Sequence, residues 1–210
     1  MAEQEHFIAV RFHRYKAFRH YSLSLHRFNV LVGPNNSGKS TVLGAFRILA
    51  EGIRKARSRN PTWGPGPEGL ALGYQLELEG IPVATENIFF DYDDSEPAYV
   101  RFRISNNNEL ILFFPGESTC YMICETQGNP VRSTSAFKSE YNVSIGFVPI
   151  LGPVEHDEPL YLKEAARLAL VTHRAARNFR NIWHHYPEDF EQFRALVRST
   201  WPGMDIEPPE

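Results

Sequence analysis

Cysteine is scarce in this chain, because only Cys120 and Cys124 occur among its 210 residues. A structural zinc site needs about four ligands, and the sequence around these cysteines offers no others. Their spacing on a predicted strand places both side chains on one face. We therefore expect two ordinary reduced thiols in a cytoplasmic protein.

Long apolar runs and a strong net charge are also lacking. No run approaches the roughly 18 apolar residues that a membrane-spanning helix needs, so no membrane contact is predicted. The opening sequence MAEQEHFIAV lacks the basic region and long apolar stretch of a secretion signal. A net charge of −3 gives no global reason to expect a polyanion partner, although a local basic face is compatible with it.

The most informative stretch is residues 27–46, RFNVLVGPNNSGKSTVLGAF. The apolar run 28–32 predicts a buried strand, and the spacing of apolar residues over 39–55 predicts a helix. A strand, a glycine-containing loop and a helix in this order form the context of a phosphate-binding loop. The pattern G-x-x-x-x-G-K-[ST] is met by Gly33, Gly38, Lys39 and Ser40.

The chemistry of a nucleoside triphosphate explains this pattern. Glycines let successive backbone N–H groups point into one anion-binding concavity, and the helix adds the positive end of its dipole. Lys39 would bring a charge to the β- and γ-phosphates, the Ser40 hydroxyl would be a Mg²⁺ ligand, and Thr41 would reach an α-phosphate oxygen. A simple glycine-rich turn explains neither Lys39 nor Ser40. The sequence therefore predicts binding of a nucleoside triphosphate with Mg²⁺.

The residues ahead of the loop indicate which class of phosphate-loop protein this is. Alternating apolar residues predict two antiparallel strands, at 8–12 and 21–25, joined by the basic-aromatic turn Tyr15-Lys16-Ala17-Phe18. Over residues 7–50 the sequence resembles the N-terminus of ABC-type ATPase heads of the SMC/RecF/OLD group, towards the OLD-like AAA family ATPases. The residues that match the loop motif of that group are Asn29, Gly33, Asn35, Asn36, Ser37, Gly38, Lys39 and Ser40.

The resemblance implies ATP as the nucleotide and assigns roles outside the loop. It places Lys16 and Arg14 beside the base and phosphates, whereas a solvated basic hairpin is the alternative. It also implies a Q-loop at residues 144–159, after a short buried strand at 145–148. That segment has no Gln, so Glu155 or Asp157 would face the metal there, and a plain acidic loop is the other interpretation.

The remaining sequence predicts further strands and helices. Strands are expected at 72–78, 98–105, 109–115 and 120–125, an irregular connector at 58–69, a long helix at 161–186 and a short one at 188–198. The acidic run DYDDSE fails the calcium-loop pattern and reads as a solvated loop. The long helix would carry a basic face, either solvated or in contact with a phosphate backbone or an acidic partner. Its arginines are Arg167, Arg174, Arg177 and Arg180.

Three elements of a complete ABC-type head are not found after Gly152: the signature, the Walker B strand and the switch His. We therefore expect an N-terminal half of such a head, completed downstream or by a separate polypeptide. The predicted fold class is α/β, a P-loop NTPase lobe with an antiparallel β subdomain and C-terminal helices. Residues 1–150 would form the ATPase lobe, and residues 151–210 the Q-loop-like and helical segments.

The predicted function is Mg-ATP binding within an SMC/RecF/OLD-like ATPase that acts with DNA in repair or anti-phage defence. Expected partners are a second ATPase half or a second copy, DNA, and a nuclease or a fused TOPRIM domain. One alternative is a nucleotide-sensing module that recruits a nuclease without hydrolysis. Another is a small-molecule phosphotransferase, which the antiparallel start disfavours.

Overall fold

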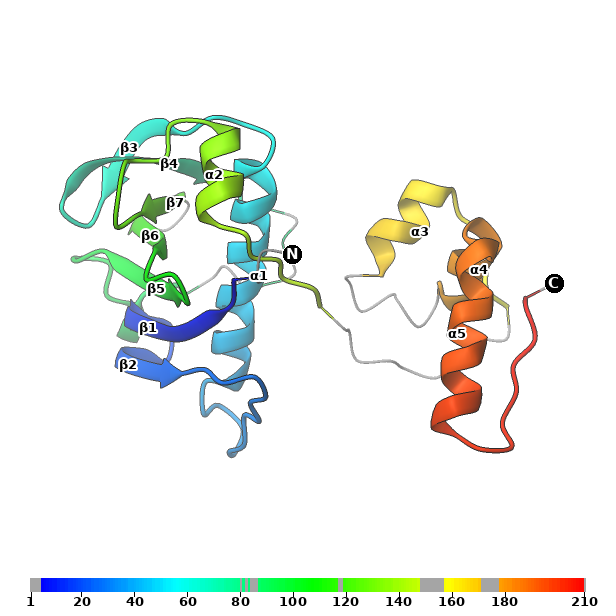
Figure 1. The fold of residues 1–210 in the computed structure, drawn as a ribbon. Coiled ribbons are helices and arrows are strands. Elements are labelled where there is room, and N and C mark those ends of the chain that lie inside the picture. Colours follow the sequence, from blue (N-terminus) through cyan, green and yellow to red (C-terminus); the bar gives the residue numbers. More distant parts are fainter. Residues whose placement is uncertain are drawn as a thin grey trace. The chain divides into compact units, whose positions relative to one another are not determined.

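The computed structural model describes residues 5–79, 81, 83, 87–116, 119–147, 157–170 and 178–209. The chain divides into two compact units, Met1–Ile145 and Gly146–Glu210, and each is described by itself. Among the residues described, the first unit combines a seven-stranded sheet with two α-helices, and the second contains three helices (Figure 1). None of the helices in the described ranges is long and apolar enough to cross a membrane.

The sheet of the first unit is entirely antiparallel. Its strands lie in the order β2-β1-β5-β6-β7-β4-β3, and the register across the triple-asparagine turn pairs Arg103 with Glu109. The hairpins form where apolar and polar residues alternate, as expected of strands with one buried face. The bounds are β1 Phe7–Tyr15, β2 Phe18–Ser24, β3 Thr62–Gly66, β4 Gly69–Leu76, β5 Ala98–Ile104, β6 Glu109–Gly116 and β7 Thr119–Glu125.

Helix α1 (Lys39–Ala56) runs across the strands and covers one face of the sheet (Figure 1). Its buried side chains recur at helical spacing and pack on the inward residues of the strands. Helix α2 (Thr134–Glu140) extends the same core with Phe137, and the Ser133 hydroxyl caps it by accepting the Ala136 N–H. The main contributors are Val42, Ala45, Ile48, Leu49 and Ile53 from α1, and Val10, Phe12, Val100, Phe102, Leu110, Leu112 and Met122 from the sheet.

The opposite face of the sheet has a small apolar cluster of its own. Ile111, Phe113 and Ile123 are buried there and pack with Tyr99 and Tyr121. The β3–β4 hairpin lies close over this cluster, because a Cβ on Gly64 of β3 would meet the Tyr121 ring. The two cysteines share one face of the strand as predicted, and this is the face that packs with α1. Cys120 is buried, and both thiols are free.

The expectation of an irregular connector at 58–69 was wrong, because β3 (Thr62–Gly66) lies within it. This strand contains Pro65, which has no N–H to donate to a ladder. β3 is the last strand in the sheet order and has β4 as its neighbour. An edge position tolerates proline, since one side of the strand needs no partner.

The strands predicted at 28–32 and 145–148 are not found among the described residues. Residues 28–32 before the glycine-rich loop form no strand, and Phe28, Val30 and Val32 are 83%, 66% and 86% exposed. Only Leu31 of this run packs against the core. An apolar run forms a buried strand only beside another strand, and no described strand pairs with it. Residues 144–147 also contain no strand, and residue 148 lies outside the described ranges.

The second unit contains α3 (Lys163–Ala169), α4 (Phe179–His185) and α5 (Pro187–Thr200). The prediction of one helix over 161–186 was wrong, because α3 ends at Ala169 and Asn178 has a non-helical backbone before α4. The predicted helix at 188–198 lies within α5 and is confirmed. Trp183 of α4 stacks on Phe193 of α5 with ring centroids 4.7 Å apart, so aromatic packing joins these two helices.

Because β4 and β7 approach closely at Gly73, we expect a side chain at this position to destabilise the fold. A Cβ there would lie 2.7 Å from the carbonyl oxygen of Met122, and a paired backbone has no room to move. Gly73→Ala should lower the free energy of unfolding by about 1–3 kcal/mol. Gly116→Ala is the matched strand control, because nothing lies within 4 Å of its added Cβ. Urea unfolding that finds equal losses for both variants would contradict this packing.

Candidate functional site: the phosphate loop

The loop between β2 and α1 turns sharply at Gly38. Gly38 has φ 89° and is the N-terminal cap of α1. A Cβ at this position would lie 2.3 Å from Cζ of Phe18, so the Phe18 ring rests directly on the glycine. Both the left-handed backbone and this contact require glycine here. The first strand pair of the sheet therefore braces the start of α1.

Lys39 closes the loop upon itself. Its Nζ donates to the carbonyl oxygens of Gly33 at 2.7 Å and Pro34 at 2.6 Å, and lies 3.3 Å from Ser37 Oγ. These contacts hold one positive charge beside the first turn of α1, which contains no acidic residue. Anions are favoured at such a helix start, where backbone N–H groups lack intrahelical acceptors.

A pocket of about 580 Å³ lies at this helix start. Most of its lining comes from the predicted motif, and Ala17 comes from the turn between β1 and β2. No carboxylate is found among the described residues that line it. The lining residues are Ala17, Asn35, Asn36, Gly38, Lys39, Ser40 and Thr41.

The turn between β1 and β2 does not place Arg14 and Lys16 in the pocket. Arg14 donates to the Asp93 carboxylate at 2.6 Å, and its Nε lies 3.6 Å from Glu96. The Lys16 backbone N–H donates to the Ile88 carbonyl at 2.7 Å, and neither Lys16 nor Arg14 lines the pocket. Their contact with a nucleotide stays a prediction. Ala17 and Phe18 are the turn residues that meet the loop, and sequence reasoning missed them.

The acidic candidates do not gather around a metal. No group of three or more potential ligands is found among the described residues, so Asp91, Asp93 and Asp94 form no such cluster. Glu155, the predicted metal-facing residue, lies outside the described residues, and Asp157 is exposed at the edge of a described range.

The predicted basic face is only partly described. Arg174 and Arg177 lie outside the described residues, as does much of the expected Q-loop segment. Arg167 pairs with Glu164 on its own helix at 3.0 Å. The Arg180 backbone N–H donates to the Glu158 carboxylate at 3.0 Å. A continuous arginine face stays a prediction.

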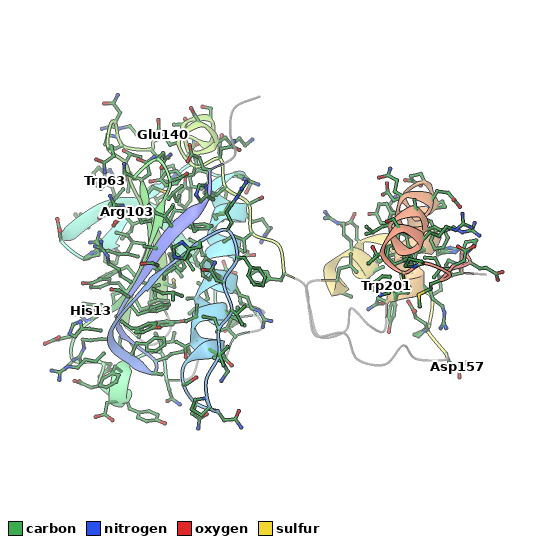
Figure 2. All side chains as sticks on the ribbon, turned by 60° about the horizontal axis from the view of Figure 1, so that its bottom comes forward. His13, Trp63, Arg103, Glu140, Asp157 and Trp201 are labelled. Atoms are coloured by element: carbon green, nitrogen blue, oxygen red, sulfur yellow. The ribbon has the colours of Figure 1, made fainter. Side chains whose placement is uncertain are left out.

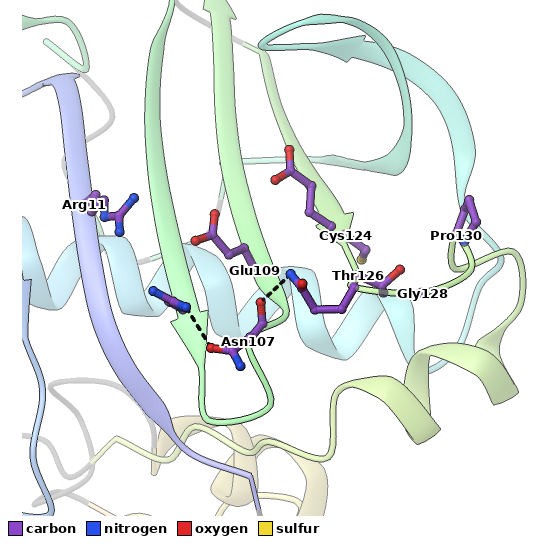
Figure 3. A pocket seen from close by; sticks show the side chains of 10 residues that line it. Arg11, Asn107, Glu109, Cys124, Thr126, Gly128 and Pro130 are labelled. Atoms are coloured by element: carbon purple, nitrogen blue, oxygen red, sulfur yellow. Dashed lines mark hydrogen bonds between the residues drawn. The ribbon is translucent and has the colours of Figure 1, made fainter.

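A second pocket, of about 670 Å³, lies at one end of the sheet's other face and shares no lining residue with the first (Figure 3). Arg11 and Arg103 project into it from neighbouring strands, and Arg103 donates to the Asn107 side chain at 2.7 Å. Glu109 and Glu125 line it too, and Arg101 donates to both carboxylates. Arg101 thus pairs with both carboxylates of the pocket.

The Asp93–Arg14 pair predicts a step in acid stability. Hydrogen bonds from Ser95 and from Arg14 lower the pKa of Asp93 from 3.8 to about 2. The unfolded chain therefore binds this proton at a higher pH, and the stabilisation present above pH 4 is lost as the pH falls towards 2. Asp93→Asn should flatten the fall in unfolding free energy over that interval, measured by urea unfolding. Asp94→Asn is the neighbouring control, and an equal effect from it would contradict the assignment.

Part of the chain matches a known protein family. Residues 28–111 match the family described as "AAA domain, putative AbiEii toxin, Type IV TA system". A solved structure of the recombination mediator protein RecF with ATP, from the RecFOR pathway, is 13% identical with a TM-score of 0.38. That comparison covers 94% of this chain and 46% of the RecF chain, so this chain spans about half of that protein's length. No curated protein sequence matches.

The family match begins just before the glycine-rich loop and continues into β6. The α/β architecture with an antiparallel sheet and helices agrees with the predicted fold class. The segment from Phe28 to Ile111 is therefore similar to an AAA domain, in a chain whose fold fits a P-loop NTPase.

Proposed function

We propose that the chain binds Mg-ATP through the phosphate loop, as the N-terminal part of an SMC/RecF/OLD-like ATPase. The observation that carries this proposal is the pocket at the start of α1, lined by motif residues from Asn35 to Thr41 with the Lys39 ammonium beside them. The assignment of DNA repair or anti-phage defence rests on the sequence resemblance alone, whereas the AAA-domain match supports nucleotide binding.

The lining residues would each contact a different part of a bound Mg-triphosphate. Backbone N–H groups of the loop and of the first turn of α1 would hold phosphate oxygens. Lys39 would exchange the Gly33 and Pro34 carbonyls for phosphate oxygens, which are stronger acceptors because they are charged. The Ser40 hydroxyl would ligate Mg²⁺. The phosphate loop therefore supplies positioning and charge, the two requirements of phosphate binding.

The exposed run 28–32 supports completion by a second half of the ATPase. Phe28, Val30 and Val32 project side chains into solvent directly before the loop, and no described strand pairs with their backbone. Exposed apolar side chains in a run with the composition of a strand are expected of a strand that lacks its neighbours. We assign the missing neighbour to a strand of the other ATPase half, on the same polypeptide or in a second subunit.

A second candidate function is nucleotide sensing without hydrolysis. No carboxylate lines the phosphate-loop pocket among the described residues, so no described group there would position an attacking water. In this case the chain would bind ATP and recruit a nuclease partner or a TOPRIM domain. The two functions differ in turnover once the other half is present.

Replacing Lys39 tests the binding proposal. Lys39→Ala removes one charge-assisted contact to phosphate and should weaken Mg-ATP binding roughly ten- to hundredfold. Isothermal titration calorimetry with a non-hydrolysable ATP analogue measures this change. Lys138→Ala, on the exposed surface of α2, is the matched control and should bind as the unchanged chain does. Equal affinity of all three proteins would refute the phosphate-loop assignment.

Turnover tests whether the chain needs a second half. Residues 1–210 alone should hydrolyse ATP only at a background rate, because phosphoryl transfer needs a positioned water and further charge stabilisation. Adding the completing half should raise the rate to the order of 1 s⁻¹. Phosphate release is the measurement, and Lys39→Ala is its control. Full-rate hydrolysis by the chain alone would contradict the half-head proposal, and tight binding with no turnover after completion would favour the sensing function.

A further inference from the structure

Two histidines face each other on the hairpin formed by β1 and β2. His13 and His20 are directly opposed partners in the antiparallel register, on the face of the sheet away from α1. Their Nδ1 atoms share a hydrogen bond of 3.2 Å, and their ring centroids lie 4.7 Å apart. The hairpin ladder holds both Cα atoms in register, so the two rings are brought together by the fold itself.

The His13 ring is also held from its other side. It stacks on Tyr99 of β5 with centroids 4.5 Å apart and an interplanar angle of 13°. His13 lies on the first unit, where Figure 2 labels it, and its ring is partly buried. His20 is exposed, so the open side of the pair faces solvent and is accessible to a small ion.

The separation of the two nitrogens suits a chelated metal ion. With a Zn–N distance of about 2.0–2.1 Å, two ligands at a tetrahedral angle have their nitrogens about 3.3 Å apart. The Nδ1–Nδ1 distance of 3.2 Å is close to that value. We propose that His13 and His20 form a two-imidazole site for a divalent transition-metal ion such as Zn²⁺. Water would complete the coordination.

The charges around the pair permit a cation. Arg14 follows His13 in the chain, and its guanidinium is paired with Asp93 at 2.6 Å and lies 3.6 Å from Glu96. Arg101, over the Tyr99 ring, is likewise paired, with Glu109 and Glu125. Imidazole is a ligand that suits zinc, copper and nickel, whereas Mg²⁺ prefers oxygen ligands. The site therefore differs in metal class from the Mg²⁺ expected at Ser40. A bound ion would cross-link the two strands that brace Gly38 through Phe18.

Zinc titration of the untagged 210-residue chain tests this site. Calorimetry with ZnCl₂ in the absence of nucleotide should find one ion bound per chain. His20→Ala removes one ligand from an exposed position and should weaken zinc binding at least tenfold, since even losses of outer partners cost about 10–100-fold. His13→Ala should give a similar loss. Circular dichroism checks that both variants remain folded.

His184→Ala is the matched control, because this exposed histidine has a neighbouring histidine ring but no opposed strand partner. It should bind zinc as the unchanged chain does. Absence of zinc binding by the unchanged chain would overturn the proposal, as would equal affinity after His20→Ala. Neither outcome depends on ATP binding, so failure here is distinguishable from failure of the phosphate-loop assignment.

Discussion

The packing of α1 against the antiparallel sheet is the interaction on which the rest of the first unit depends. One stripe of the helix is buried from Val42 to Ala56 on the inward side chains of the strands. The same helix starts at Lys39, so the burial that stabilises the core also fixes where the phosphate loop ends. Phe18 of β2 rests on Gly38 and ties the other side of the loop to the sheet. The candidate site is thus held by core packing on both sides.

The features visible in the sequence are those with local causes. Alternation identified the β1–β2 and β5–β6 hairpins, and the helical stripe identified α1, because each pattern reflects one buried face. The motif likewise located the loop that begins α1. Ala17 and Phe18 were missed as site residues, because their role arises from how the hairpin turn packs on Gly38. A contact between segments distant in the sequence produces no periodic pattern of residues from which it could be predicted.

The wrong predictions at 28–32 and 58–69 have a common physical basis, since both depend on neighbouring strands that sequence periodicity does not reveal. Residues 28–32 have the composition of a buried strand, yet no described strand lies beside them. The proline- and glycine-rich composition of 58–69 suggested irregular structure, yet β3 forms there at the edge of the sheet, where Pro65 is tolerated. The helical spacing over 161–186 did not reveal the break before α4 at Asn178. The exposed run 28–32 is one basis of our proposal that a second ATPase half packs beside the phosphate loop.

Hydrogen exchange of the backbone amides, with and without a non-hydrolysable Mg-ATP analogue, tests the central claim most directly. If the loop holds the phosphates, the amides from Asn35 to Thr41 should become protected, because their N–H groups would then donate to phosphate oxygens. The second pocket, around Arg11 and Arg103, should remain unchanged. Protection confined to that pocket, or none in the loop at saturating nucleotide, would contradict the account.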